Sequence, residues 1–188
     1  MAVRSIQEEK DSVFFCTITC YDWLPLFQQT DFYSEIYKWF DLSGKKSCHI
    51  YGYVIMPNHL HFLIYIPKSV KNLNTLISNG KRFMAYEIIS RLNKQGNYQM
   101  LKTLRKKVSE KDGHKGQLHR VFRSSFDSKP CYSEEFILQK LDYMHHNPVS
   151  GKWNMVEDFT DYLHSSAKFY ELNTKGVYKI THYKNFTG

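Results

Sequence analysis

The residues best suited to chemistry are two histidines, His59 and His61, in an apolar run over residues 59–66. Side chains of a β-strand alternate between its two faces, so both imidazoles should project from one face while Leu60 and Phe62 project from the other. Two neutral imidazoles on one face can share a divalent ion and leave coordination positions for a substrate oxygen. Taken alone, the spacing favours two satisfied surface histidines over a metal site.

Tyr143 is the second candidate, in a helical pattern over residues 133–146. At about 100° per residue, Tyr143 and Asn147 fall together, nearly opposite an apolar stripe of Ile137, Leu138, Leu141 and Met144. A tyrosine with a pKa of about 10 is a poor nucleophile at neutral pH, so a metal or a base must assist it. The Asn147 amide could supply a third metal ligand. In a chain with 14 tyrosines, packing remains the ordinary explanation for any one of them.

The elements that must position these residues follow from hydrophobic periodicity and turn residues. In chain order we expect a strand over 13–21, a helix over 31–41, a hairpin of strands 47–56 and 59–66 turned at Pro57-Asn58, a helix over 68–92, a strand over 118–125 and a helix over 133–146. This order predicts an α+β fold, a ferredoxin-like antiparallel sheet with helices on one face. We expect one domain over residues 1–188, with the aromatic-rich segment 148–188 packed back on it as a C-terminal extension.

The charge balance points to an anionic partner. The formal net charge is +8, and basic surfaces bind nucleic acids by releasing condensed counterions. The 14 Tyr and 13 Phe leave rings available for stacking on bases. Candidate DNA contacts are the basic residues Lys81, Arg82, Arg105, Lys106, Lys107, Arg120 and Arg123. The cluster at 105–107 lies in a polar insertion over 93–117 and fits a solvated helix face as well as a phosphate-binding patch.

The four cysteines contain no C-x-x-C pair and are interpreted as reduced core thiols. Cys16 and Cys20 could meet His49 in a zinc site, although the spacing matches no familiar template. No apolar run approaches the roughly 20 residues that span a bilayer, and the chain does not begin like a signal peptide. We therefore expect a cytoplasmic protein that does not contact a membrane.

Two strings together resemble a known family. They are YVIMPNHLHFLI at 53–64 and YMHHNPV at 143–149, and they resemble the single-tyrosine HUH transposases, specifically the REP-associated, IS200-like branch. The segments 14–19, 126–135 and 165–170 are also similar to their counterparts in that family. The chain departs from the family in the length of its 93–117 insertion and in having Leu163-His164 where a Pro-Trp pair is frequent.

The resemblance implies an HUH fold with Mg²⁺ or Mn²⁺ held by His59, His61 and Asn147. It implies that Tyr143 attacks a phosphodiester of single-stranded or hairpin DNA, leaving a 5′-phosphotyrosine and a 3′-hydroxyl that can attack in reverse. The protein would act as a monomer or homodimer. One alternative is a catalytically inactive, domesticated protein that binds such DNA. Another is a structural zinc module, for which the cysteine nearest the histidine pair is Cys48, on the neighbouring strand.

Overall fold

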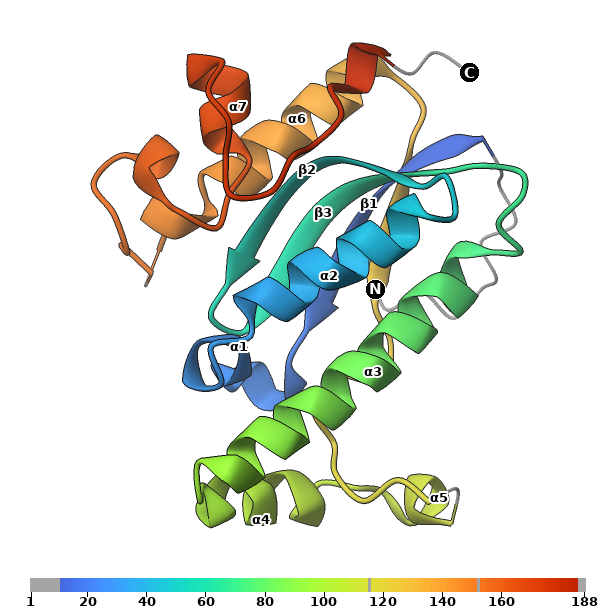
Figure 1. Ribbon diagram of the computed structural model, residues 1–188, viewed down its shortest axis with the longest axis vertical. Helices are drawn as coiled ribbons and strands as arrows, with labels where there is room; N and C mark the ends of the chain where they lie inside the picture. Colours follow the sequence, from blue (N-terminus) through green and yellow to red (C-terminus); the bar gives the residue numbers. More distant parts are fainter. Residues whose placement is uncertain (1–10, 115, 152, 186–188) are drawn as a thin grey trace.

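A four-stranded antiparallel sheet forms the centre of the molecule, with strand order β2-β3-β1-β4 (Figure 1). The computed structural model describes residues 11–185 except 115 and 152. The strands are β1 (Ser12–Thr19), β2 (His49–Met56), β3 (His59–Ile66) and β4 (Asp127–Cys131). The α+β, antiparallel fold class expected from the sequence is confirmed.

The first core lies between one sheet face and the helices α2 (Tyr33–Gly44) and α3 (Leu73–Lys94). The alternation in β3 sends Leu60, Phe62 and Ile64 into this core, where all three are fully buried. Residues 57–58 form the tight turn of the β2-β3 hairpin, as the sequence predicted.

The second core lies on the opposite sheet face, beneath α6 (Glu134–His145). The expectation that the helices share one face is therefore wrong, and Figure 1 shows α6 across the sheet from α2 and α3. The reason is that this second face also carries large apolar side chains, such as Leu63 and Tyr65, which must be removed from water. Gly52 on β2 allows α6 to approach the sheet closely, because a Cβ there would lie 2.5 Å from Cδ2 of Leu141.

The fourth strand is β4, and the expected strand over 118–125 is wrong. In that segment Phe122 makes only an isolated bridge to Cys20. Pro130 has no N–H to donate to a neighbouring strand. It is tolerated because β4 is at the edge of the sheet and pairs with β1 alone.

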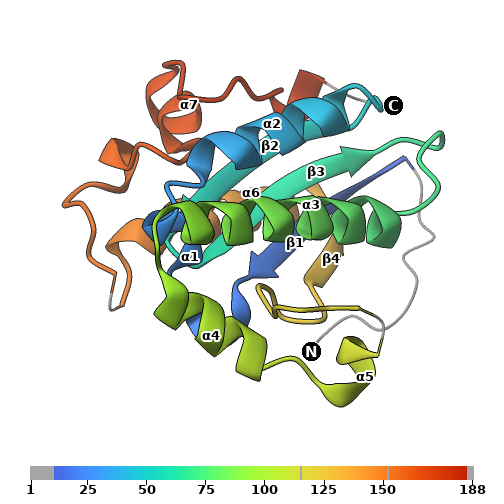
Figure 2. The ribbon, with the colours of Figure 1, turned by 60° about the horizontal axis from the view of Figure 1, so that its bottom comes forward.

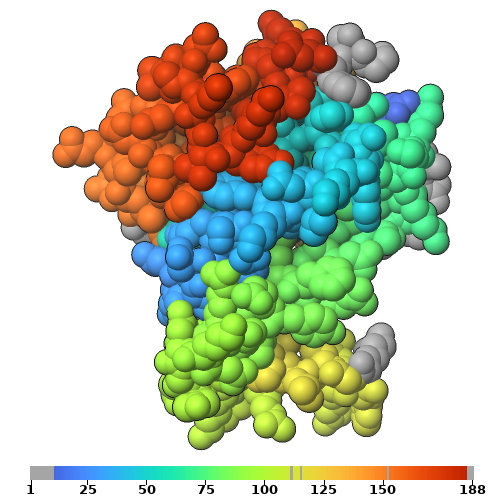
Figure 3. Space-filling model, viewed as in Figure 1, coloured from blue at the N-terminus to red at the C-terminus, as the bar shows by residue number. Residues whose placement is uncertain are grey.

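The insertion forms α4 (Tyr98–Lys106) and α5 (Glu110–Gly113), which lie beyond the end of α3 and away from the sheet (Figure 2). The C-terminal segment runs along β2, where Ile55 N donates to His164 O and Ser166 N donates to Tyr53 O, each at 2.9 Å. Figure 3 shows it as a continuous red and orange layer beside α2.

The remaining elements are short. They are the 3-10 turns η1 (Tyr21–Trp23), η2 (Asn147–Val149), η3 (Phe159–Asp161) and η4 (Tyr183–Asn185), and the helices α1 (Leu26–Gln29) and α7 (Ala167–Leu172). Within the described residues, no helix combines the length and apolar character needed to cross a bilayer.

Candidate functional site

His59 and His61 project from the β3 face that α6 covers, as the strand alternation predicted. Their ring centroids lie 4.7 Å apart at an interplanar angle of 76°. Burial, and next the neighbouring His59, hold the pKa of His61 well below its usual range, so its imidazole is neutral at pH 7. A neutral imidazole is the form that binds a metal.

Each imidazole is held at its Nδ1 atom by a side chain that sequence reasoning missed. The Thr17 hydroxyl lies 2.7 Å from Nδ1 of His61. Oδ1 of Asn58 lies 2.6 Å from Nδ1 of His59. Because the Asn58 amide nitrogen donates to Trp23 O at 2.8 Å, its oxygen must face His59 and accept from Nδ1–H. That tautomer places the ring's lone pair on Nε2 of His59.

Tyr143 lies on α6, and its ring contacts His61 on the sheet face that α6 covers. Its ring stands edge-on to His61, with centroids 5.4 Å apart, and edge-on to Phe15 at 6.0 Å. Tyr143 is 51% exposed, although its ring contacts two buried side chains. The structure thus brings Tyr143 beside His61, 82 positions away in the sequence.

Lys140, one turn before Tyr143, is a further candidate that sequence reasoning missed. Its ammonium lies 5.9 Å from the centroid of the Tyr143 ring and 5.6 Å from that of Phe15. A cation here can attract a phosphate. The i, i+3 spacing on the helix was the available signal.

Asn147 follows α6 at the start of η2, and its amide nitrogen donates to Tyr143 O at 2.9 Å. This hydrogen bond ends the helix and leaves the amide oxygen as the atom that could bind a metal. Of the apolar stripe expected on α6, Ile137, Leu141 and Met144 are buried, whereas Leu138 is 47% exposed.

The donor set fits a labile divalent ion better than structural zinc. Among the described residues, no three His, Cys, Asp or Glu side chains are grouped to hold a metal, so a third ligand to the histidine pair would have to be an amide, a water or the substrate. Cys16 and Cys20 are fully buried, and burial raises the pKa of each thiol, so the zinc sites considered from the sequence are not supported. Two imidazoles and an amide oxygen would leave coordination positions open.

Trp23 flanks the histidine pair on the side of η1. Its ring stands edge-on to His59, with centroids 5.7 Å apart. Asp22 and Trp23 both have positive φ, at 54° and 57°, which costs about 1–2 kcal/mol for each residue. No periodic signal in the sequence marks this turn.

The predicted DNA contacts fall into two groups. Arg105, Lys106 and Lys107 are exposed at the end of α4, and Arg82 is exposed on α3. By contrast, Arg120 lies 4.7 Å over the Tyr21 ring, and Arg123 lies 5.2 Å over the Trp23 ring.

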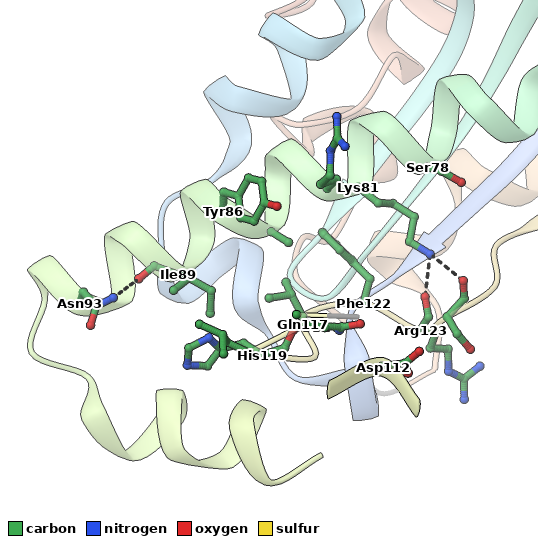
Figure 4. Close-up of a pocket in the computed structure, with 16 residues that line it drawn as sticks. Ser78, Lys81, Tyr86, Ile89, Asn93, Asp112, Gln117, His119, Phe122 and Arg123 are labelled. Carbon is green, nitrogen blue, oxygen red and sulfur yellow. Dashed lines mark hydrogen bonds between the residues drawn. The ribbon is translucent and has the colours of Figure 1, made fainter. Parts of the chain in front are cut away.

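Lys81, another of the candidate DNA contacts, is partly buried on α3. Its ammonium donates to Arg123 O at 2.6 Å and to Ser124 O at 3.4 Å (Figure 4). It also donates to Ser125 O at 3.3 Å. Burial lowers the pKa of Lys81 to about 8, so the ammonium still predominates at pH 7. Lys81 therefore fixes the backbone that carries Arg123.

A groove of about 720 Å³ separates α3 from the segment over 112–124 (Figure 4). Tyr86, Ile89 and Phe122 contribute apolar lining, and Arg82 and Arg123 contribute positive charge. Arg123 thus belongs both to this groove and to the Trp23 contact.

No protein-family model and no curated protein sequence matches the chain. A solved structure of a REP-associated tyrosine transposase bound to a REP hairpin is similar, with a TM-score of 0.62 and 14% identity over 89% of this chain and 83% of that one. A putative transposase from Deinococcus radiodurans R1 gives a TM-score of 0.42 and 13% identity over 78% of this chain and 95% of that one. The first similarity establishes the fold, which is that of the tyrosine transposase.

Proposed function

We propose that the chain is a metal-dependent transposase that cleaves and rejoins single-stranded DNA through a 5′-phosphotyrosine intermediate. The observation that carries the proposal is the position of Tyr143, half-exposed and 5.4 Å from the ring of His61. The similarity of the fold to that of a tyrosine transposase supports it.

The cleavage step exchanges one phosphodiester for another. The Tyr143 oxygen loses its proton and attacks phosphorus, the new Tyr–O–P bond forms, and the bond from phosphorus to the 3′ oxygen breaks. The 3′ oxygen takes up a proton and leaves as a hydroxyl, which can later attack the phosphotyrosine in reverse. Because the number of phosphoester bonds is unchanged, ATP is not required.

His59, His61 and Asn147 would hold the metal, in a site whose two imidazoles are already oriented by Asn58 and Thr17. Bound Mg²⁺ or Mn²⁺ would supply Lewis-acid stabilisation of charge on the non-bridging phosphate oxygen. Lys140 would add positive charge beside the tyrosine. The DNA backbone would be contacted by the exposed basic residues Arg82, Arg105, Lys106 and Lys107.

The partner would be single-stranded or hairpin DNA, because the tyrosine needs an exposed backbone and aromatic rings need unstacked bases. The protein would bind it in the cytoplasm, as a monomer or a homodimer. At matched salt, such DNA should bind more tightly than an unrelated duplex of equal length. Equal affinity for both would count against the proposal.

The decisive test is Tyr143→Phe, with single-stranded oligonucleotides taken from the DNA that flanks the gene. Wild type with Mn²⁺ should form a protein–DNA adduct that survives a denaturing gel, and Tyr143→Phe should form none while it retains DNA affinity. Tyr98→Phe, on α4 and 69% exposed, is the matched control and should behave as wild type.

Three results would contradict the proposal in different ways. An adduct that persists in Tyr143→Phe would identify another nucleophile. Tight binding of single-stranded or hairpin DNA without any adduct in the wild type would identify the catalytically inactive, domesticated binding protein instead. Cleavage that survives a chelator, or that survives both His59→Ala and His61→Ala, would remove the metal from the mechanism.

A further inference from the structure

Trp23 and Arg123 form an exposed pair beside the histidines. The Arg123 guanidinium carbon lies 5.2 Å over the Trp23 ring, and the same ring meets His59 edge-on at 5.7 Å. Trp23 is 46% exposed and Arg123 is exposed as well. The pair therefore joins the histidine site to the groove that Arg123 lines.

Packing does not explain why a tryptophan stands here. Trp23 is absent from both apolar cores of the described residues. It follows Asp22 in a turn where both residues have positive φ, a conformation unfavourable for side chains with a Cβ. Such strain is retained mainly where a local geometry serves a function.

Backbone contacts hold both members of the pair in place. Trp23 O accepts from the Asn58 amide at 2.8 Å, and Trp23 N donates to Cys20 O at 3.2 Å. Arg123 N donates to Thr19 O at 3.0 Å, and Arg123 O accepts from Lys81 at 2.6 Å. The backbone of both residues is thus fixed before a ligand binds, which favours binding.

We infer that Trp23 and Arg123 form a stacking site for one unpaired base of single-stranded DNA, next to the phosphate that Tyr143 attacks. The inference rests on the proposed function. Tryptophan faces and guanidinium planes are the surfaces on which proteins stack unpaired bases, and the arginine can also contact the adjoining phosphate. The contact between Trp23 and His59 places this base beside the histidine pair.

The test compares two fluorescent strands of equal length and charge, an oligothymidylate and a fully abasic strand, in chelator so that no cleavage occurs. Trp23→Ala should weaken oligothymidylate binding about ten-fold and leave abasic-strand binding unchanged. Trp23→Phe, which keeps a smaller ring, should recover part of the affinity. Arg123→Lys, which keeps the charge and loses the plane, should weaken binding of the oligothymidylate alone.

The control is Tyr98→Ala, which removes a more exposed ring from α4 and should leave both affinities unchanged. Thermal melting of each variant checks that it folds. Equal weakening of both strands by Trp23→Ala, or equal wild-type affinity for both strands, would overturn the stacking site. If wild type forms the adduct but Trp23→Ala loses no affinity for the oligothymidylate relative to the abasic strand, this site alone is rejected. If Trp23→Ala shows that loss but wild type forms no adduct, the transposase proposal alone is rejected.

Discussion

Thr17 and His61 are direct partners across the β1-β3 pair, and the Thr17 hydroxyl lies 2.7 Å from Nδ1 of the histidine. Asn58 makes the equivalent contact with His59. Both rings are therefore oriented by neighbours that are not themselves proposed ligands, and this arrangement can be tested apart from the ligands.

Thr17→Val keeps the size and branching of the side chain but removes the hydrogen bond to His61. We expect the metal concentration for half-maximal cleavage to rise about 10- to 100-fold, with little change in DNA affinity. Asn58→Ala should act in the same direction at His59. Titrations of cleavage rate against Mn²⁺ measure both effects, with Thr103→Val on α4 as control. Superimposable metal curves for Thr17→Val and wild type would show that the contact does not orient a ligand.

Asn147 has two separable roles, because its nitrogen bonds to Tyr143 O while its oxygen is the proposed ligand. Asn147→Ala should cleave slowly at low Mg²⁺ or Mn²⁺ and regain much of its rate at higher metal. Asn147→Asp should regain more, since a carboxylate binds hard cations well. Loss of the hydrogen bond alone should cost about 1 kcal/mol of unfolding free energy. A lowered melting temperature with an unshifted metal curve would leave only the helix-ending role.

His145 should make the folded state sensitive to acid. Burial, and next the neighbouring His146, lower the pKa of His145 to about 3, and its Nε2 lies 2.8 Å from Ser166 Oγ. In the unfolded chain His145 takes up a proton as the pH falls below about 6.5, whereas in the folded chain it stays neutral. The free energy of unfolding is therefore fully retained above about pH 6.5 and decreases as the pH falls below it.

The expected loss is about 1.4 kcal/mol of unfolding free energy per pH unit below that point. Chemical denaturation between neutral pH and pH 5 should show a smaller loss in His145→Gln, which can keep a hydrogen bond to Ser166. His146→Gln, at a partly exposed position, should keep the wild-type slope. Identical slopes for wild type and His145→Gln would refute this source of acid sensitivity.

Gly52 and Gly44 form a matched pair of positions for testing how closely α6 packs on the sheet. A Cβ at Gly52 would lie 2.5 Å from Cδ2 of buried Leu141, whereas a Cβ at Gly44 meets nothing within 4 Å. Gly52→Ala should cost about 1–3 kcal/mol of unfolding free energy and slow cleavage, because α6 carries Tyr143. Gly44→Ala, at the end of α2, should be neutral or stabilising. Unfolding free energies from denaturant titration test both, and an unaffected Gly52→Ala would mean that α6 adjusts freely.

Local periodicity was enough to predict the hairpin and the shared face of His59 and His61. It could not predict that α6 crosses to the second face of the sheet, because that depends on the apolar residues of all four strands together. Lys81 shows the same limit. Its spacing on α3 suggested exposure, but its long side chain reaches backbone carbonyls of a segment that was itself mistaken for a strand.

The orienting contacts of Asn58 and Thr17 illustrate a different difficulty. Asn58 lies within the recognised string, yet its partner Trp23 O is 35 positions away in a left-handed turn. Thr17 is placed opposite His61 only by the register of β1 on β3. Sequence spacing carries no signal for either contact, so the ligands could be proposed before the residues that hold them.

The C-terminal segment has a consequence for self-association. Beyond the backbone bonds at Tyr53 and Ile55, the hydroxyls of Tyr162 and Tyr170 donate to Ile55 O and Tyr51 O. The outer polar groups of β2 are thus occupied by the chain's own tail. Removing residues after 161 would leave a strand of bare amides and carbonyls flanked by large apolar side chains, which is a template for edge-to-edge aggregation. With the tail in place, the β2 edge of the sheet is not open to pairing with a second copy.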